Sequence, residues 1–560
     1  MKMARCDDPN KAFRPDFYTL CLGILILFHF LTNGIWIYLN KVPPAHDAGF
    51  HTVLSMRFFD YIKGFPGNFS IVEFLTISKY YPPLSHIVGT LFVWFGNYNY
   101  QFVQLTGSVF FSLSLIMVYI YTARLTKNKA IALLSTVFFS FFYLEFRESR
   151  SHMTDMPLTF FVIGGLYFFE RSDNLRNRIC SVLFFVFFSL AFLTKWTSLV
   201  FFLFPVLTIG IGLVKKDGLS KYDIVKNIFL GIIVTAALCL PWYYVNSKTI
   251  IQIAQVTSTP ELDDPSILFS WDNVFFYLRQ LIIFQISFIG FLLFLFSVIR
   301  LNLTRKYTNI LRILMLQIGI SYIFFTFFIG NKNVRFLFPM MPFIAIVMAM
   351  GLVDIRGRIG KSLLIGTILT YYVFSYFVVS FGVPFYPKFK HAIQFPLVGW
   401  VDIYYLSDDP ISALYKKENW QTDKVGTLIL EHSKGIKRFI YFINIEKPYL
   451  NTSTIHLSIY KYGRGFPENI QEVDTNFPLT LKGNNEFVNQ TDLEQWVNGI
   501  DFVAIPLKDI GPQEAMRDYR VRKQIQQYFL NKKPYGFEMI DAINLPTGDK
   551  IFIYKKQAPF

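Results

Sequence analysis

Long apolar stretches separated by short polar segments fill the chain as far as residue 381. A helix that crosses a bilayer needs about 20 apolar residues. Eleven stretches approach that length, namely residues 17–39, 102–123, 129–147, 156–170, 179–194, 196–214, 227–245, 273–299, 310–329, 336–353 and 362–382. The pattern predicts an α-helical polytopic membrane protein with about 11 transmembrane helices.

The positions of lysine and arginine predict the orientation of these helices. Cytoplasmic loops carry an excess of Lys and Arg. If the N-terminus is cytoplasmic, every second connecting segment is basic, namely residues 2–14, 124–129, 171–178, 215–226, 300–312 and 356–361. The first run ends without a small-residue cleavage pattern, so we expect it to be a retained anchor helix. We therefore expect a multi-pass protein of the cell (inner or plasma) membrane with its N-terminus inside.

Two shorter apolar segments, Ala48–Ile62 and Pro82–Phe95, interrupt the first long loop. Counting the second as a crossing would invert the charge pattern of every later loop. We therefore predict two juxtamembrane helices on the outer membrane surface and a loop, residues 40–101, that is wholly external.

The composition changes after residue 381, where the long apolar stretches end. Strand-like runs at residues 438–445, 501–507 and 550–554 alternate with helical patterns at 424–432 and 512–530. The chain is thus expected to have a transmembrane domain, residues 1–381, and an extracytoplasmic α/β domain, residues 382–560.

The overall composition agrees with a membrane protein. Hydrophobic residues make up 53% of the 560 residues and charged residues only 16%, which excludes a large soluble enzyme. The formal net charge of +16 is then explained by basic cytoplasmic loops, and no nucleic-acid partner is expected. The four cysteines have no paired spacing and indicate neither a disulfide framework nor a metal site.

Ionisable side chains recur in the segments assigned to the outer face. Because such groups are costly beside a membrane, their collection on one side indicates a functional site. They are His46, Asp47, His51, Tyr80, Tyr81, His86, Arg147, Glu148, Arg150, His152, Asp155, Lys195, Lys332 and Arg335. One or two carboxylates among several cations suit an enzyme that acts on an anion, such as a lipid-linked phosphate, with a carboxylate as base.

Each of these residues also has a purely structural interpretation. Asp47 and Asp155 both precede predicted helices and are favoured helix caps. Lys195 fits a lysine that extends to the membrane interface, and Arg335 fits an interfacial anchor. His46 and His51 are five residues apart, so a metal bound by both would need a distant further ligand. No cofactor is certain, and the question of a divalent metal stays open.

Six segments in order resemble the membrane-embedded GT-C glycosyltransferases, in the branch of bacterial aminoarabinose transferases and protein O-mannosyltransferases. They are the first outer loop with Asp47, Tyr80–Leu84, Arg150–Leu158, Ala191–Lys195, Pro241–Tyr243 and Lys332–Pro339. The resemblance covers roughly residues 15–380. It implies a polyprenyl-phosphate-linked sugar donor, attack from the extracytoplasmic side and inversion at the anomeric carbon.

The resemblance also implies roles for individual residues. Asp47 and Asp155 correspond to the two outer aspartates of the family, and Lys195 to the lysine of its Leu-Thr-Lys motif. Many members have Glu after the first Asp where this chain has Ala48, so the function of a second carboxylate there is in doubt.

We assign roles on both grounds. Asp47 is the expected base, with Asp155 as second catalytic carboxylate. The expected ligands of the donor phosphate are Lys195, Arg150, Arg335 and Lys332, and the residues expected to orient the substrate are His46, His51, His152 and Tyr81.

Two other classes of function remain open. A transporter or flippase of a lipid-linked anionic glycan precursor would share the helices and the cationic pocket, and a structural protein would use its exported tail to recruit enzymes. For the enzyme, the partners expected are the bilayer, a polyprenyl-phosphate-sugar donor and a glycolipid, polysaccharide or protein acceptor. The sequence identifies neither the sugar nor the acceptor.

Overall fold

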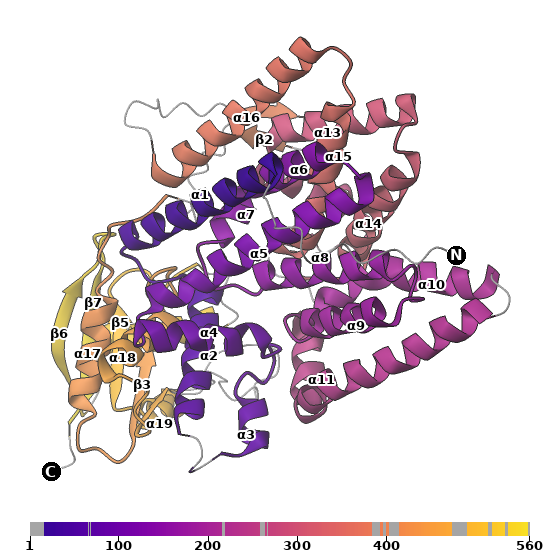
Figure 1. Cartoon of the computed structure of the whole chain (residues 1–560). Coiled ribbons are helices and arrows are strands. Elements are labelled where there is room, and N and C mark those ends of the chain that lie inside the picture. Colours follow the sequence, from indigo (N-terminus) through magenta and orange to yellow (C-terminus); the bar gives the residue numbers. More distant parts are fainter. Residues whose placement is uncertain are drawn as a thin grey trace.

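The computed structural model describes residues 16–557, except 65–66, 68, 216–218, 258–263, 266, 383–391, 396–398, 403–413, 473–489, 513–517 and 532–535. Helices as far as residue 381 form one bundle, and a smaller domain built on a sheet lies at one end of it, beside α2 and α4 (Figure 1). The prediction of a helical membrane part followed by a small α/β domain is confirmed.

The bundle contains long, short and interrupted helices. They are α1 (Phe17–Leu39), α2 (His46–Lys63), α3 (Ile71–Thr76), α4 (Leu84–Gly96), α5 (Tyr100–Thr126), α6 (Lys129–Phe141), α7 (Tyr143–Glu148), α8 (Asp155–Arg171), α9 (Arg178–Phe192), η1 (Trp196–Phe202), α10 (Leu203–Lys215), α11 (Leu219–Thr257), α12 (Trp271–Gln280), η2 (Leu281–Gln285), α13 (Ser287–Thr304), α14 (Thr308–Phe327), η3 (Val334–Met340), α15 (Met341–Val353) and α16 (Arg358–Phe381).

The predicted apolar stretches all fall on helical segments, but not all form one long helix. Among the described residues, 7 helices are long and apolar enough to cross a membrane by length and composition. The stretch 129–147 divides at Phe142, whose ψ of 135° is extended, into α6 and α7. The stretch 273–299 contains the π-helical turn η2. The chain is a multi-pass membrane protein, and the number of 11 crossings stays a prediction.

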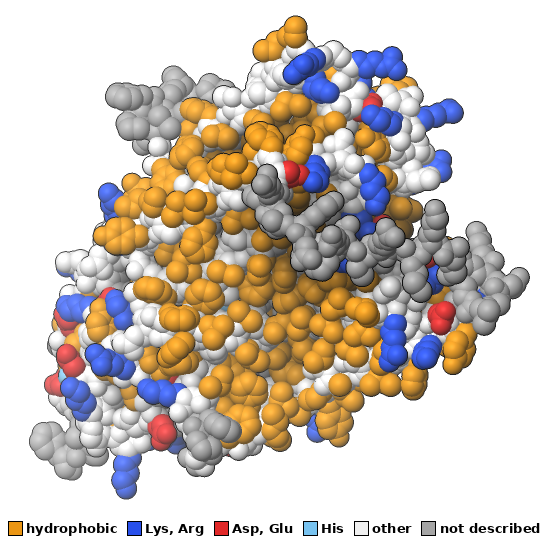
Figure 2. All heavy atoms as spheres, in the orientation of Figure 1, with side chains coloured by type: hydrophobic (Ala, Val, Ile, Leu, Met, Phe, Trp, Pro, Cys, Tyr) orange, Lys and Arg blue, Asp and Glu red, His pale blue; other side chains and the backbone are white. Residues whose placement is uncertain are grey.

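On the face shown in Figure 2, hydrophobic side chains cover the bundle, whereas charged side chains gather over the smaller domain and at helix ends. On α1, for example, Leu20, Ile24, Leu27 and Leu31 are all exposed. Contiguous apolar surface of this extent is typical of a surface that faces lipid. At the centre of the bundle, residues 341–352 of α15 are all buried, as expected for a helix that is apolar on every side.

The smaller domain has a five-stranded sheet with the strand order β4-β3-β5-β7-β6. Its strands are β3 (Phe439–Ile443), β4 (Ile470–Glu472), β5 (Phe502–Pro506), β6 (Phe537–Asn544) and β7 (Lys550–Lys556), and a separate hairpin joins β1 (Ala392–Phe395) and β2 (Gly399–Asp402). The pairs β3–β4 and β3–β5 are parallel, and β5–β7 and β6–β7 are antiparallel.

Helices cover both faces of this sheet. Because side chains alternate along a strand, Tyr441 and Ile443 of β3 pack with α17 (Thr422–His432) and α18 (Thr452–Gly463). Phe442 packs on the other face with α19 (Gln490–Val497) and α20 (Tyr519–Asn531). The predicted strands and the helix at 424–432 are confirmed, whereas the helix predicted from residue 512 begins at Tyr519 among the described residues.

The two helices predicted in the first outer loop exist as α2 and α4, and α3 between them was not predicted. The sheet domain docks on this pair, because α18 packs along α2. The Asp60 carboxylate accepts a hydrogen bond from the Phe466 backbone N–H at 3.1 Å and another from the Tyr98 hydroxyl. Helix α2 is thus enclosed between the bundle and the sheet domain. Its position at the membrane surface stays a prediction.

The loop between α7 and α8 carries several candidate site residues, and it is set by a close approach to α5. A Cβ atom added at Gly107 would lie 2.2 Å from the Ser151 carbonyl oxygen. Both are backbone positions that cannot move aside cheaply. Only glycine therefore allows this loop to lie against α5.

We predict that Gly107→Ala lowers the thermal unfolding midpoint of the detergent-purified protein. Overpacking against backbone typically costs about 1–3 kcal/mol. Gly319→Ala is the matched control, because nothing lies within 4 Å of a Cβ at that helical position. Equal midpoints for the two variants would contradict the close approach.

Candidate functional site

The first turn of α2 presents Asp47 to the interior of the molecule. The helix begins at His46 and its N-cap, Ala45, makes no side-chain capping bond. The Asp47 carboxylate is not used as a cap; its Oδ2 lies 2.6 Å from Nη2 of Arg335. An acid in a first turn is also favoured by the helix dipole.

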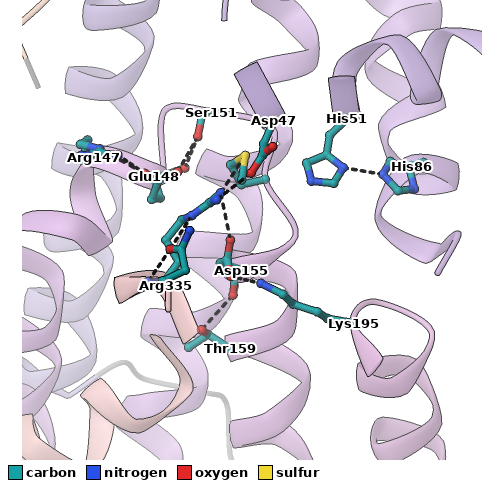
Figure 3. A network of polar contacts seen from close by, with 12 residues as sticks. Asp47, His51, His86, Arg147, Glu148, Ser151, Asp155, Thr159, Lys195 and Arg335 are labelled. Atoms are coloured by element: carbon teal, nitrogen blue, oxygen red, sulfur yellow. Dashed lines mark hydrogen bonds and ion pairs between the residues drawn. The ribbon is translucent and has the colours of Figure 1, made fainter. Parts of the chain in front are cut away.

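Asp155 occupies the corresponding position in the first turn of α8 and is fully buried. Its Oδ1 accepts a hydrogen bond from the Lys195 ammonium at 2.8 Å, and its Oδ2 lies 4.0 Å from Nη1 of Arg335. Lys195 therefore binds a carboxylate and does not extend away to the interface. Figure 3 shows Arg335 between the two aspartates, with Lys195 on the far side of Asp155.

These four residues, Asp47, Arg335, Asp155 and Lys195, are called the charge network below. They come from α2, η3, α8 and the segment before η1. A buried charge is stable only when it is paired and hydrogen-bonded. Two carboxylates and two cations lie next to each other here, so each charge has a partner of opposite sign within the network.

The guanidinium of Arg335 is fixed by its own turn. The Asn333 side chain caps η3, accepting from the backbone N–H of Arg335 at 3.0 Å and from its Nε at 3.1 Å. Gln285 of η2 donates to the Val334 carbonyl at 2.9 Å and ties the same turn to a second helix. Arg335 is therefore directed toward the carboxylates and is not a simple interfacial anchor.

Asp47 and Arg335 line a cavity of about 540 Å³, which also reaches His46, Glu148 and Arg150. Trp36, Leu144, Phe284 and Val334 give it apolar wall, and Leu414 and Tyr449 reach it from the chain beyond residue 381. A concave site with a few convergent polar groups on apolar walls is typical of a ligand site.

Burial and charge act against each other on the Asp47 carboxyl. Burial among protein atoms would raise its pKa, but the Arg335 guanidinium, with smaller contributions from His51 and Lys195, lowers the pKa to about 2. The side chain is still half exposed to the cavity. Asp47 is therefore an ionised carboxylate that a ligand can reach.

Arg150 lies in the same cavity but is held by neutral groups. It donates to the Asn33 amide oxygen at 3.0 Å and to the Ser380 hydroxyl at 2.8 Å. Its guanidinium carbon lies 5.2–6.0 Å from the ring centres of Trp36, Phe146, Tyr376 and Phe381, within the range of cation–π attraction. Among the described residues no carboxylate forms an ion pair with it.

Three histidines pack behind Asp47. Nδ1 of His51 lies 2.9 Å from Nε2 of His86, and Nε2 of His152 lies 2.8 Å from the Ser55 hydroxyl. Burial lowers the pKa of His51 to about 4 and, with His51 nearby, that of His152 to about 3. Burial and both neighbours also lower the pKa of His86. The three rings are neutral hydrogen-bonding groups near pH 7.

The other two predicted orienting residues lie on either side of this cluster. The Tyr81 ring packs 4.7 Å from that of His51, and burial raises its pKa. His46 lies at the cavity wall, where its Nδ1 is 3.9 Å from Glu446. Tyr81 thus supports the histidine cluster, and His46 faces the cavity.

Lys332 is not brought to the charge network. Its ammonium donates to the carbonyl oxygens of Phe325, Thr326 and Ile329, at 2.9, 2.7 and 2.6 Å. Phe325 and Thr326 belong to the last turn of α14, whose final carbonyls lack helical partners and favour a cation, and Ile329 follows the helix. The structure therefore places this lysine as a helix cap, away from the cavity where we had expected it.

Sequence reasoning did not assign a role to three residues of the site. His86 contacts His51, Asn333 holds Arg335, and Glu148 forms an ion pair with Arg147 at 2.9 Å beside the cavity. All three lie in or beside the outer segments that carry the predicted residues, so location was a signal. The contact of His86 with His51 was not visible in the sequence, because the two residues lie 35 positions apart and only the fold brings them together.

Within the part of the chain that the structure describes, no group of three or more His, Cys, Asp or Glu residues is placed to hold a metal ion. Of the three histidines behind Asp47, His51 and His86 bond to each other, and His152 bonds to Ser55.

The whole chain has the fold of a protein of known structure. Its overall structure is similar to that of ArnT from Cupriavidus metallidurans in the apo state, with a TM-score of 0.58, 12% identity and coverage of 97% of this chain and 98% of that chain. ArnT bound to undecaprenyl phosphate gives a TM-score of 0.55 at 11% identity, covering 96% and 98%.

A family model gives a second, partial match. Residues 71–253 match the model described as dolichyl-phosphate-mannose-protein mannosyltransferase. The S. cerevisiae Pmt1-Pmt2 complex bound to the sugar donor is 17% identical over 43% of this chain and 35% of that chain, with a TM-score of 0.34. No curated protein sequence matches significantly. The predicted resemblance to the GT-C fold is confirmed.

We predict that Lys332→Met lowers the unfolding midpoint, because three carbonyls at the end of α14 lose their donor at once. Unsatisfied buried polar groups cost roughly 1–3 kcal/mol each. The affinity for undecaprenyl phosphate should stay unchanged at temperatures well below that midpoint. Lys127→Met, at an exposed position, is the control. A specific loss of lipid affinity in a fully stable Lys332→Met protein would contradict the capping role.

Proposed function

We propose that this protein is an inverting glycosyltransferase of the membrane, which moves a sugar from a polyprenyl-phosphate donor to an acceptor hydroxyl on the extracytoplasmic face. The observation that carries the proposal is the charge network beside the cavity, with Asp47 reachable and Asp155 buried. The likeness of the whole fold to ArnT, for which a complex with undecaprenyl phosphate is known, and the match to a mannosyltransferase family model support it.

Asp47 is the proposed general base. An acceptor hydroxyl becomes a strong nucleophile only when a base removes its proton during attack. Asp47 is ionised and half exposed to the cavity. With Arg335 against it, however, the carboxylate is a weak base, because its pKa lies far below neutral pH.

We infer that the donor itself activates Asp47. A phosphate that enters the cavity competes for the Arg335 guanidinium, since bidentate pairing with phosphate is as favourable for arginine as pairing with carboxylate. Once Arg335 turns to the phosphate, the largest influence that lowers the pKa of Asp47 weakens and its basicity rises. Binding of the donor is thereby coupled to readiness of the base.

The leaving group needs positive charge and no proton donor, because a phosphate is already a stable anion. Arg335 lies at the cavity, Arg150 lines it and Lys195 lies behind Asp155. Fixed cations aimed at developing negative charge are the largest single contribution in many enzymes. Asp155, between Lys195 and Arg335, helps to position both cations during this step.

The histidines and Tyr81 are proposed to orient the reacting groups. His51 lies one turn after Asp47 on α2 and bonds to His86, which restrains the helix face that carries the base. His152 is bound to Ser55 of the same helix, and Tyr81 packs on His51. His46, at the cavity wall, is the one of the four that can contact a substrate directly.

We predict that Asp47→Asn lowers the rate constant of sugar transfer by about 10²–10⁴, the range usual for loss of a general base. Binding of undecaprenyl phosphate should persist or tighten, because Arg335 loses its competing carboxylate. Transfer is measured in proteoliposomes with a panel of labelled undecaprenyl-phosphate sugars and membrane extract as acceptor.

Asp173→Asn is the matched control, since Asp173 forms an exposed ion pair with Arg176 away from the cavity. Near wild-type transfer by a folded Asp47→Asn protein would exclude Asp47 as base. Movement of labelled lipid across the bilayer without any covalent transfer by the wild type would favour a flippase.

The second prediction concerns Arg335→Gln. Removing the cation leaves burial to raise the pKa of Asp47, so the acid limb of the pH profile of kcat/KM should move to higher pH. In the wild type, free Asp47 has a pKa of about 2, and the acid limb should not reflect its protonation above pH 5. The measurement is kcat/KM between pH 4.5 and 8, with Arg279→Gln as control, since Arg279 is a partly exposed arginine of α12 that pairs with Asp272. An unmoved acid limb would contradict the coupling.

A further inference from the structure

The cavity has two chemically different walls. The cations that line it among the described residues all belong to the helical bundle. They are Arg147, Arg150 and Arg335. The chain beyond residue 381 contributes Leu414 and Tyr449. Within the described residues, the sheet domain therefore lines the cavity with apolar and aromatic surface and with no cation.

This second wall is held firmly against the bundle. The backbone N–H of Lys41 donates to the Lys416 carbonyl at 2.7 Å, and that of Lys416 donates to the Asn40 side chain at 2.9 Å. At the other end of α2, Asp60 binds the Phe466 backbone. Bonds at both ends of the interface fix the wall relative to Asp47.

Tyr449 is the aromatic centre of this wall. Its ring lies 5.7 Å from that of Trp420, and the Lys416 ammonium lies 5.1 Å from its ring centre. The residue is largely buried, with 8% of its surface exposed, and it lines the cavity. Glu446 adds a carboxylate close by, 3.9 Å from His46 at the cavity wall.

We propose that the sheet domain forms the acceptor half of the site, that the acceptor is a carbohydrate, and that Tyr449 is its specificity-determining contact. The inference rests on the proposed function and extends it. It gives the sheet domain a part in the reaction, beyond stabilising α2.

The direction of the reaction supports this division. In an inverting transfer, the acceptor oxygen forms its bond to the anomeric carbon opposite the bond to phosphate that breaks. The phosphate leaves with the bonding electron pair toward the cations of the bundle, and the acceptor proton goes to Asp47. The acceptor must therefore approach from the side away from the three arginines, which among the described residues is the side of Leu414 and Tyr449, where the Lys416 ammonium lies against the Tyr449 ring.

The chemistry of the wall favours a sugar ring over a charged or peptide acceptor. An aromatic side chain supplies a flat apolar surface at low entropic cost, which suits the C–H face of a pyranose. Glu446 and His46 supply hydrogen-bonding groups for hydroxyls close to that surface. Carbohydrate hydroxyls are also nucleophiles of the kind that Asp47 is placed to deprotonate.

The test uses the purified full chain in proteoliposomes with undecaprenyl phosphate carrying a labelled hexose or pentose. Acceptor probes are a panel of n-octyl glycosides and a threonine-rich peptide. Affinity for unlabelled undecaprenyl phosphate is measured separately and reports on the donor half. Variants are Tyr449→Ala, Tyr449→Phe and Leu414→Trp, and Tyr462→Ala is a tyrosine control in the same domain but outside the cavity.

We expect Tyr449→Ala to lower kcat/KM for the octyl glycoside by at least about tenfold, chiefly through KM, as for loss of a buried aromatic contact. Tyr449→Phe keeps the ring face and should stay within about threefold, and undecaprenyl phosphate affinity should change by less than about twofold in both. Tyr462→Ala should match the wild type.

Leu414→Trp covers the case in which Tyr449→Ala does not fold, because Leu414 is exposed and a larger side chain there narrows the acceptor side. It should raise the acceptor KM and leave lipid affinity intact. An unchanged acceptor KM in the folded wall variants, with an active wild type, overturns this inference alone. Transfer to the peptide and not to glycosides overturns the carbohydrate assignment. A wild type that neither binds the lipid nor transfers sugar overturns the proposed function.

Discussion

Arg335 joins charged side chains from parts of the chain that lie far apart in sequence. Its guanidinium lies between Asp47 of α2 and Asp155 of α8, and Asp155 in turn binds Lys195. A fully buried carboxylate such as Asp155 is tolerated only with cations beside it. Electrostatic balance therefore determines where these elements can lie, and it leaves Asp47 as the one member that is both charged and half exposed.

The sheet domain and the bundle share α2, so neither is complete without the other. Val53 and Met56 of α2 pack in one cluster with Leu457 and Tyr460 of α18. The face of α2 that carries Asp47 and the histidines turns instead to the bundle. A helix with two buried faces cannot shift to suit one of them alone, and this rigidity is what a preorganised site requires.

Periodicity and charge predicted the helical bundle, the two outer helices and several strands, because these depend on local pattern. Interruptions such as the π-helical turn Leu281–Gln285 could not be predicted, since a π turn arises from packing against other helices and apolar sequence continues through it. The same holds for the division at Phe142.

At the site, the sequence pointed to the residues that the charge network joins, because outer location and residue type are both visible in it. It gave no way to separate Lys332 from Lys195. Both are lysines near a helix end, and only the fold shows that one meets backbone carbonyls and the other a carboxylate. The position of Tyr449 in the site could not be predicted for a related reason, because this residue belongs to the sheet domain and lines a cavity formed mainly by the bundle.

The aromatic rings and neutral polar groups around Arg150 have a consequence for the binding of anions. Rings and amides stabilise this cation without cancelling its charge, whereas Arg335 and Lys195 are neutralised by the aspartates. The cavity should thus attract anions. Chloride or sulfate in a buffer would bind where a natural anion binds. Ionic strength thereby becomes a competitor for the pocket as well as a screen of its field.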